Sequence, residues 1–317
     1  MSMSGSLSPR ETFTVRGHEA AVQLFLDALA SGRLHHAWLL HGPAGIGKAT
    51  LAFHLARVLL KATDSGSPAG RRVTAGTHAD LMVIGRGVDE RKGRLRPEIV
   101  ADDVRPIQSF LHRTAAEGGW RVVIVDGAEF MNRHAANGLL KLLEEPPAQV
   151  AFFLVTASPG GLLPTIRSRC RGLALQPLAD VDMRAVLQTM GYDAQDMPRL
   201  LATAHGAPGR AAFLALDRDG AIQRQVAEWL GRDAPRVTVE QAEAIARQDD
   251  GFALLCDLLG DAMTRRAREM ALGDRTTEAA RMAAGYAALS ALRRETGRFN
   301  LDKTQAVLQA AAIVSEL

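Results

Sequence analysis

Apolar residues follow two different spacings in the first part of the chain. Within 19–30, and again within 49–60, they recur every three or four positions, which is typical of a helix with one buried face. The segment "AWLLH" at 37–41 is instead a short continuous apolar run, as in a strand that is covered on both faces. Because glycines separate this run from the second helical pattern, we expect a helix, then a strand that leads through a tight loop into another helix.

Later apolar runs alternate with helical patterns up to about residue 178. "RVVIVD" at 121–126 and "VAFFLVTAS" at 150–158 are continuous apolar runs, and "GLALQPL" at 172–178 is a shorter one. This alternation of strand and helix predicts an α/β domain with a mainly parallel sheet. The other segments that we expect in it are a helix capped by Asp103 that runs to Leu111 with Pro106 in its first turn, an exposed polar excursion at 63–77, a polar segment at 89–98, and helices near 135–145 and 165–170.

The strand pattern stops beyond Pro177, and helical patterns follow to the last residues. Thr238 and Gln241 have the spacing of a helix capping box. We expect helices at 180–190, 196–205, 251–270, 277–295 and 301–315. The predicted division is a flexible tail at 1–14, an α/β domain at 15–176, a small helical domain at 177–218 and an all-α domain at 219–317.

Composition narrows the class of protein without naming a function. The chain has 317 residues, of which 47% are hydrophobic and 23% charged, as in globular proteins of two or three domains. Its 38 basic and 35 acidic residues give a formal net charge of +3, which permits contact with nucleic acid but does not demand it. Cys170 and Cys256 lie far apart with no CxxC motif, so neither a zinc module nor a disulfide framework is expected. Since no signal peptide or membrane-spanning run is seen, we expect a cytoplasmic protein.

The glycine-rich loop after the first strand has the sequence of a phosphate-binding loop. Gly42, Gly45, Gly47 and Lys48 match the pattern GxxxxGK. Glycines let backbone N–H groups turn toward phosphate oxygens, the lysine reaches the terminal phosphates, and the following helix adds partial positive charge at its N-terminus. A glycine-rich turn without a ligand is the alternative, but the strand and helix on either side favour a phosphate loop.

Two positions differ from what an ATP-hydrolysing site needs. Ala49 stands where Ser or Thr normally coordinates magnesium, and Thr50 comes one residue late, turned away by a helix step of about 100°. Asp126 ends the next core strand, where an acidic residue either holds magnesium through water or caps the following turn. Gly127 takes the place of a general-base glutamate, and Glu129 is the nearest carboxylate. Weakened magnesium binding and impaired hydrolysis are therefore expected together.

Several arginines could contact phosphate groups. Arg167, Arg169 and Arg171 alternate in "TIRSRCR", either as surface charge or as a phosphate contact in a neighbouring subunit, because a guanidinium pairs well with phosphate oxygens. Arg210 opens a helix after the turn "GAPG", where it either senses a γ-phosphate or caps the turn.

Taken together, four stretches resemble the bacterial clamp-loader branch of the AAA+ proteins. They are "RLHHAWLLHGPAGIGKATLA", "VVIVDGAEFMNRHAANGLLKLLEEPP", "FFLVTASPGGLLPTIRSRC" and "GAPGRA", in this order. The resemblance extends over residues 15–212, whereas the C-terminal helices match only in length and in "FNLDKTQAVLQA". "LLKLLEEPP" followed by "SRC" is specific to clamp loaders, which the phosphate loop alone is not.

The resemblance implies an accessory subunit of a DNA-directed DNA polymerase, the nucleotidyltransferase of replication. Such a subunit has an AAA+ domain, a helical lid and a helical collar, and it joins gamma or tau and delta subunits in a hetero-oligomeric ring that loads a sliding clamp onto primer-template DNA. No contact with a membrane is implied. By resemblance, Arg169 reaches into the ATP site of the adjacent subunit. The nucleotide-site residues map onto Gly42, Gly45, Gly47, Lys48, Thr50, Asp126 and Arg210, and a sensor strand maps onto 156–158.

The departures from the family pattern favour a subunit that does not hydrolyse ATP. The gamma and tau subunits carry Thr and Glu where this chain has Ala49 and Gly127. Two alternatives remain for the loop: it holds ATP without hydrolysing it, or it is inherited architecture. Many relatives carry a four-cysteine zinc insertion, but 62–80 contains no cysteine, so zinc is not expected. The competing hypotheses are an autonomous gamma-type ATPase that uses Thr50 and Glu129, and, with no acceptor motif to support it, a nucleotide kinase.

Overall fold

The computed structural model divides the chain into two compact units, residues 1–212 and 213–317. It describes residues 8–89, 94–117, 119–217, 219–231, 237–248 and 250–317. No helix in these ranges is long and apolar enough to cross a membrane. Each unit is described by itself below.

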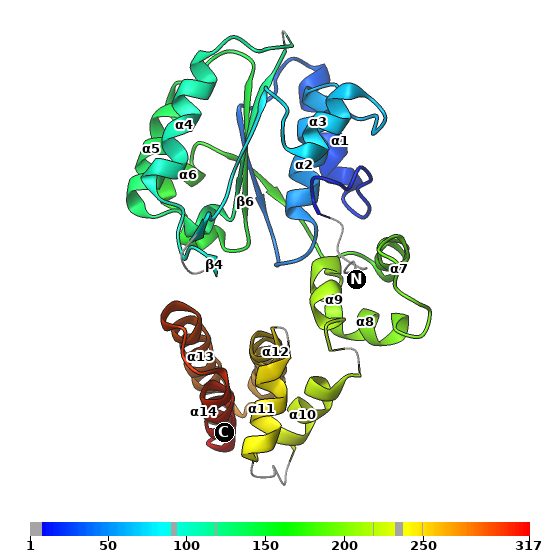
Figure 1. Ribbon diagram of the computed structural model, residues 1–317, viewed down its shortest axis with the longest axis vertical. Helices are drawn as coiled ribbons and strands as arrows, with labels where there is room; N and C mark the ends of the chain where they lie inside the picture. Colours follow the sequence, from blue (N-terminus) through cyan, green and yellow to red (C-terminus); the bar gives the residue numbers. More distant parts are fainter. Residues whose placement is uncertain (1–7, 90–93, 118, 218, 232–236, 249) are drawn as a thin grey trace. The chain divides into compact units, whose positions relative to one another are not determined.

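The first unit contains the predicted parallel sheet, whose five strands run in the order β2-β5-β6-β1-β7. All four neighbouring pairs are parallel. The inner strands are continuous apolar runs because helices cover both faces of the sheet (Figure 1). The strands are β1 (Ala37–His41), β2 (Leu81–Ile84), β5 (Arg121–Asp126), β6 (Val150–Thr156) and β7 (Arg171–Ala174).

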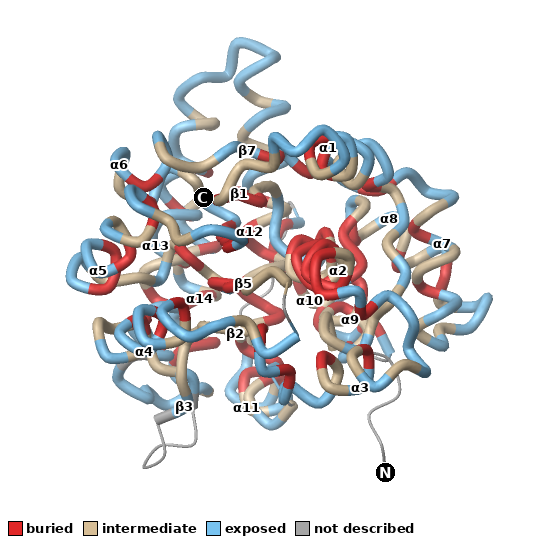
Figure 2. Tube along the Cα trace, turned by 90° about the horizontal axis from the view of Figure 1, so that it is seen from above, coloured by how far each residue is buried: buried red, intermediate tan, exposed pale blue. Residues whose placement is uncertain are grey.

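Helices lie on both faces of the sheet (Figure 1). Successive residues of β6 divide the interior, since Phe153 packs into the core on one face and Phe152 into the core on the other. Helix α2 is the most deeply buried, and Figure 2 shows it mainly in the colour of buried residues. One face carries α1 (Glu19–Ala30), α2 (Lys48–Leu59) and α3 (Pro68–Ala75), and the other carries α4 (Ala101–His112), α5 (Arg133–Glu144) and α6 (Pro164–Arg167).

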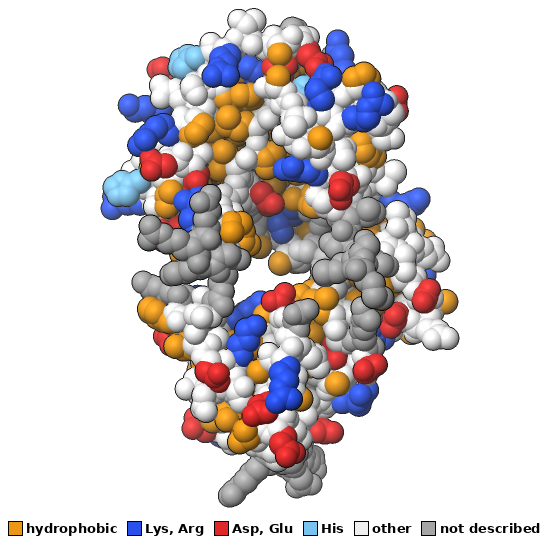
Figure 3. All heavy atoms as spheres, in the orientation of Figure 1, with side chains coloured by type: hydrophobic (Ala, Val, Ile, Leu, Met, Phe, Trp, Pro, Cys, Tyr) orange, Lys and Arg blue, Asp and Glu red, His pale blue; other side chains and the backbone are white. Residues whose placement is uncertain are grey.

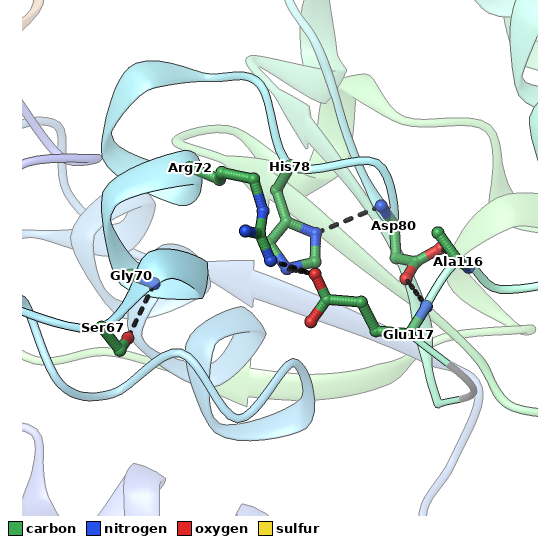
Figure 4. A network of polar contacts seen from close by, with 7 residues as sticks. All are labelled: Ser67, Gly70, Arg72, His78, Asp80, Ala116 and Glu117. Carbon is green, nitrogen blue, oxygen red and sulfur yellow. Dashed lines mark hydrogen bonds and ion pairs between the residues drawn. The ribbon is translucent and has the colours of Figure 1, made fainter.

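Helix α3 lies inside the segment 63–77 that was expected to be an exposed excursion. Its Val73 is fully buried, so part of this segment belongs to the core. Pro68 occupies the first turn, and the Ser67 hydroxyl caps the helix by accepting from Gly70 N at 3.0 Å (Figure 4). Most of the segment is exposed, as predicted, but the helix was missed because Gly, Ser and Pro mark the ends of helices as well as loops.

The helix predicted from Asp103 begins earlier, at Ala101. Asp103 lies inside the first turn, where its carboxylate accepts a hydrogen bond from Val100 N at 2.8 Å. It therefore stabilises the helix end without being the capping residue. Pro106 consequently lies beyond the first turn, inside the helix. Before α4, β3 (Val88–Asp89) and β4 (Arg94–Leu95) form an antiparallel pair within the predicted polar segment 89–98, of which residues 90–93 lie outside the described ranges.

A partly buried polar network joins α3 to the segment that follows α4 (Figure 4). The Asp80 carboxylate is almost fully buried and accepts from Ala116 N at 2.8 Å and from Glu117 N at 3.1 Å. Glu117 forms an ion pair with Arg72 of α3. His78 Nδ1 accepts from Asp80 N at 3.2 Å, and burial lowers the pKa of His78. The network fixes the loop that leads into β5.

Helices make up the rest of the chain, as predicted. The first unit ends with α7 (Asp180–Thr189), α8 (Met197–Ala204) and the first residues of α9 (Pro208–Leu214). The capping box of Thr238 and Gln241 is present at the start of α11, whereas α10 had not been predicted. The second unit contains α10 (Ala221–Trp229), α11 (Val239–Arg247), α12 (Gly251–Leu272), α13 (Thr276–Phe299) and α14 (Lys303–Ser315). The finer division of the first unit at residue 176 stays a prediction.

Candidate functional site

A cavity of about 350 Å³ lies in the first unit, beside the predicted phosphate loop. Its volume falls in the range of small-molecule sites. The phosphate loop, the segment before α1, the ends of β5 and β6, and the helices after the sheet all contribute to its wall. The lining residues are Pro9, Thr12, Thr14, Val15, Arg16, His18, Gly45, Ile46, Gly47, Lys48, Ala49, Thr50, Asp126, Val155, Leu178, Val186, Thr189, Met190, Pro208, Gly209 and Ala212.

The loop has the backbone of a phosphate cradle. Gly45 and Gly47 have φ angles of 77° and 98°, which residues other than glycine rarely adopt. Gly45 is also in close contact with the start of α9, since a Cβ atom on it would lie 2.7 Å from Arg210 N. Gly47 immediately precedes α2, so the N-terminal end of that helix faces the cavity with its unpaired N–H groups. This arrangement suits an anion.

Lys48 is buried at the first turn of α2 and closes the loop on itself. Its ammonium group donates to the carbonyl oxygens of Gly42, at 2.9 Å, and Pro43, at 2.6 Å. Burial lowers the pKa of Lys48, while Glu129 and Asp126 act in the opposite direction. Gly42 is therefore a partner of Lys48 and does not line the cavity itself.

Two further hydrogen bonds hold the loop against its surroundings. His18 is buried, and its Nε2 bonds with the carbonyl oxygen of Ile46 at 2.8 Å. Gly209 N, at the start of α9, donates to Gly45 O at 2.8 Å. Sequence reasoning missed both residues, because each lies far along the chain from the loop it contacts.

Ala49 and Thr50 both lie on the cavity wall. The expectation that a helix step turns Thr50 away concerned the magnesium ion, and it stays a prediction. Ala49 supplies no hydroxyl group, so Thr50 is the hydroxyl nearest in sequence to Lys48 on this wall.

Asp126 ends β5 and lines the cavity, as predicted for an acidic residue of a phosphate site. The residue is exposed on the cavity wall, but the atoms packed around its carboxyl group partly withdraw it from water, and this withdrawal and the nearby Glu129 both raise the pKa of Asp126. Lys48 lowers it. The three charges thus lie within electrostatic reach of one another.

Gly127 could not carry a glutamate without strain. Its φ is 76°, and a Cβ atom on it would lie 2.7 Å from the Phe130 ring. Glu129 does not replace the missing base, because it is not on the cavity wall and its Oε1 accepts from Ala157 N at 2.9 Å. The carboxylate links the short helix η1 (Ala128–Phe130) to the end of β6.

The two predicted phosphate-contacting arginines do not line the cavity. Arg210 Nε donates to Thr203 O at 3.1 Å, so its guanidinium is attached to α8. Arg169 follows α6, pairs with Glu144 at 2.6 Å, and donates to Thr165 O at 2.9 Å.

Arg169 and the phosphate loop lie at opposite ends of the strands. In the parallel pair β1 and β7, Trp38 lies opposite Arg171 and His41 opposite Ala174. The loop follows His41 at the carboxyl ends of the strands, whereas Arg169 precedes Arg171 at the amino ends. The strands between them span roughly 10 Å or more.

Charge and potential metal ligands add no second site. Within the ranges that the structure describes, no group of three or more His, Cys, Asp and Glu side chains could hold a metal ion. Figure 3 shows acidic and basic side chains scattered over the visible faces of both units. The cavity is therefore the feature that best accounts for the chemistry of the motifs.

Comparisons with known proteins agree with these motifs. A family model described as DNA polymerase III, delta subunit, matches residues 17–179. The chain is 39% identical over 181 residues to the DNA polymerase III subunit delta' of Pseudomonas aeruginosa, which covers 55% of this chain and 53% of that protein. It is 36% identical over 193 residues to the delta' subunit of Escherichia coli, covering 58% and 55%. The chain thus spans about half the length of the curated relatives it matches.

Other subunits of the same polymerase also match. The tau subunit of Escherichia coli is 30% identical over 285 residues, covering 80% of this chain and 43% of that protein. A gamma subunit-related protein of Thermotoga maritima, whose structure is solved, has a TM-score of 0.50 at 19% identity and covers 92% of this chain and 99% of its own. The latter similarity concerns the fold.

Proposed function

We propose a specific role for this chain, which belongs to the DNA polymerase III delta-subunit family of clamp-loader proteins and has an AAA+ α/β domain followed by helices. It acts as a delta-prime subunit that does not hydrolyse ATP and completes the ATP site of a neighbouring subunit with Arg169. Gamma or tau and delta subunits are its partners in a hetero-oligomeric ring, and the ring loads a sliding clamp onto primer-template DNA.

The position of Arg169 carries this proposal. An arginine that serves phosphate chemistry must reach the phosphate. Arg169 precedes the amino end of β7, whereas the phosphate loop of its own chain follows the carboxyl end of β1. The phosphate group that Arg169 can contact is therefore that of a nucleotide bound to a neighbouring subunit. The planar guanidinium stabilises charge on a transferring phosphoryl group, which is worth about 10³-fold or more in rate in related chemistry.

The chain's own cavity supports binding without hydrolysis. A magnesium-coordinating hydroxyl is missing at Ala49, and the positive φ of Gly127 and the nearby Phe130 ring disfavour a general-base side chain at that position. The loop backbone and the N-terminal end of α2 nevertheless keep the form that favours phosphate. We therefore propose that the cavity holds an adenine nucleotide, with Gly45, Gly47 and Lys48 at its phosphate end.

A gamma-type ATPase is the second candidate. It is favoured by the place of Thr50 on the cavity wall. Against it stands Glu129, whose carboxylate is bonded to Ala157 N and away from that wall. Thr50 alone supplies no base for the attacking water.

Reconstitution with gamma-type subunits, delta, clamp and primed DNA tests the proposal. The isolated chain should show negligible ATPase activity, and its addition should stimulate turnover by the complex. Arg169→Ala should lower that turnover at least tenfold while assembly on size exclusion is unchanged. Arg167→Ala, two residues away on the exposed surface, is the matched control.

Robust hydrolysis by the isolated chain, abolished by Lys48→Ala, would overturn the first proposal in favour of the second. Unchanged turnover with Arg169→Ala in an assembled complex would remove the role assigned to Arg169.

A further inference from the structure

The segment before α1 forms one wall of the cavity. We call residues 8–16 the N-terminal strap. Pro9, Thr12, Thr14, Val15 and Arg16 of the strap line the cavity, together with the phosphate loop. The expected flexible tail covered residues 1–14, of which 1–7 lie outside the described ranges. Within residues 8–14, Arg10, Thr12 and Phe13 instead contact α2.

Arg57 of α2 is the main anchor of the strap. Its side chain is only 1% exposed. Its Nη1 donates to Thr12 O at 3.0 Å, and its Nη2 donates to Arg10 O. The guanidinium also lies over the Phe13 ring, 3.9 Å from the ring centre. One side chain thus holds three residues of the strap, Arg10, Thr12 and Phe13.

The neighbouring turn of α2 adds a weaker contact. His54 Nδ1 bonds with Phe13 O at 3.3 Å. His54 and Arg57 are three residues apart, so they point the same way from the helix. The face of α2 that bears them is therefore the docking face for the strap.

Arg57 depends on the strap as much as the strap depends on Arg57. The hydrogen-bond partners of its guanidinium in the described chain are main-chain carbonyl groups, and burial lowers the pKa of Arg57. A buried cation is costly unless it is hydrogen-bonded and in contact with polarisable groups. Displacement of the strap would remove both carbonyl partners and the aromatic ring at once, so the two parts stabilise each other.

We propose that Arg57 is a positioning residue for nucleotide binding, which holds the strap as the cavity wall that contacts the nucleoside part of the ligand. The inference rests on the proposed nucleotide binding and adds a residue to it. Helix α2 carries Lys48 in its first turn and Arg57 near its end. One rigid helix therefore fixes both the phosphate loop and the strap.

The cavity wall combines two kinds of chemistry. The phosphate loop and Lys48 supply N–H groups and positive charge. Val15 of the strap and the apolar side chains of Val186 and Met190 contribute apolar surface to the same cavity. An apolar wall suits a base and contributes nothing to a bare phosphate chain. The ligand class is a nucleoside phosphate, and inorganic polyphosphate, which gains nothing from apolar surface, should depend on the strap less than a nucleotide does.

The test compares two probes on the full chain: a fluorescent ATP analogue and inorganic tripolyphosphate. Arg57→Met keeps the length of the side chain and removes its donors, and Phe13→Leu removes the ring from the strap side. Arg71→Met is the matched control, because Arg71 lies exposed on α3. Circular dichroism and thermal unfolding establish that each variant is folded.

Both test variants should raise the Kd of the nucleotide about tenfold, since each removes contacts that order the wall. The Kd of tripolyphosphate should change less than about twofold, because the loop and Lys48 are untouched. Arg57→Lys, with a single compact cation, should restore part of the nucleotide affinity. Trypsin should cleave after Arg10 and Arg16 faster in Arg57→Met than in the wild-type chain.

Equal losses for both probes would show that Arg57 supports the whole domain, and would overturn the inference. So would an unchanged nucleotide Kd in a variant whose strap is cleaved faster. A wild-type chain that binds tripolyphosphate but no nucleotide would refute the proposed nucleotide binding and this inference together. Nucleotide binding that survives all strap variants would refute the inference alone.

Discussion

Gly127 is the position at which the chain differs most sharply from an ATP-hydrolysing site, and it allows a direct test. Gly127→Glu would place a carboxylate where the resemblance to gamma and tau subunits implies a general base. The backbone there has a φ of 76°, and the new Cβ atom would lie 2.7 Å from Phe130 Cδ2. The substitution should therefore destabilise the fold without creating activity.

The expected loss follows from these two effects. A residue with a Cβ atom in the left-handed region costs about 1–2 kcal/mol. Crowding of a neighbouring side chain costs about 1–3 kcal/mol, and the lower end applies because Phe130 is 37% exposed and can move. Together they lower the free energy of unfolding by about 2–3 kcal/mol, a large part of the usual stability of a domain.

Urea unfolding of Gly127→Glu and Gly127→Ala measures this loss. Both should be destabilised, since both carry the Cβ atom. Gly160→Ala is the control, because a Cβ atom there meets nothing within 4 Å and its φ is not positive. The reasoning would be refuted if Gly127→Glu were as stable as the wild-type chain, or if Ala49→Thr combined with Gly127→Glu gave ATPase activity that Lys48→Ala abolished.

Two carboxylates give further predictions. Asp126→Asn should raise the free energy of unfolding at pH 7. Withdrawal from water and nearby Glu129 raise the pKa of Asp126, so the folded state binds a proton more readily than the unfolded chain does. Ionisation of Asp126 therefore costs stability above the pKa of the folded state. In urea unfolding at several pH values the gain should vanish below the ordinary value of 3.8, and a gain independent of pH would contradict the argument. Asp80→Asn should lose about 1–3 kcal/mol, because its buried carboxylate accepts two main-chain N–H groups. The exposed Asp102→Asn should lose less than about 1 kcal/mol, and equal losses in the two variants would refute this assignment.

The sheet could be predicted from the sequence because its strands are continuous apolar runs. Residues 121–126 and 150–156 are buried along almost their whole length, as strands covered on both faces are. Helix α3 could not be recognised in the same way, since only Val73 and Gly70 are buried in a polar segment of eight residues. Helix α10 is similarly short, and its Gly220 cap has no side-chain acceptor to mark the start.

The candidate site also contains residues that a local sequence pattern reveals and residues that only the fold brings together. The glycines and Lys48 were predictable because they form a local pattern, and Asp126 because it ends a strand. The strap was not, since Arg57 lies 45 residues from Thr12 along the chain, and only the folded structure brings them together. Its single local sign was an arginine inside the apolar run "LARVLL".

The two roles proposed for this chain are joined by one pair of strands. Strand β1 runs directly into the phosphate loop, and β7 begins just after Arg169 and pairs with β1 along its length. The position of Arg169 is therefore fixed by the sheet and by Glu144, with no part supplied by the occupant of the cavity. A subunit built in this way can present its arginine to a neighbour while its own site has lost the groups for hydrolysis. On the proposed function, the substitutions at Ala49 and Gly127 would therefore carry no penalty for the role proposed for Arg169.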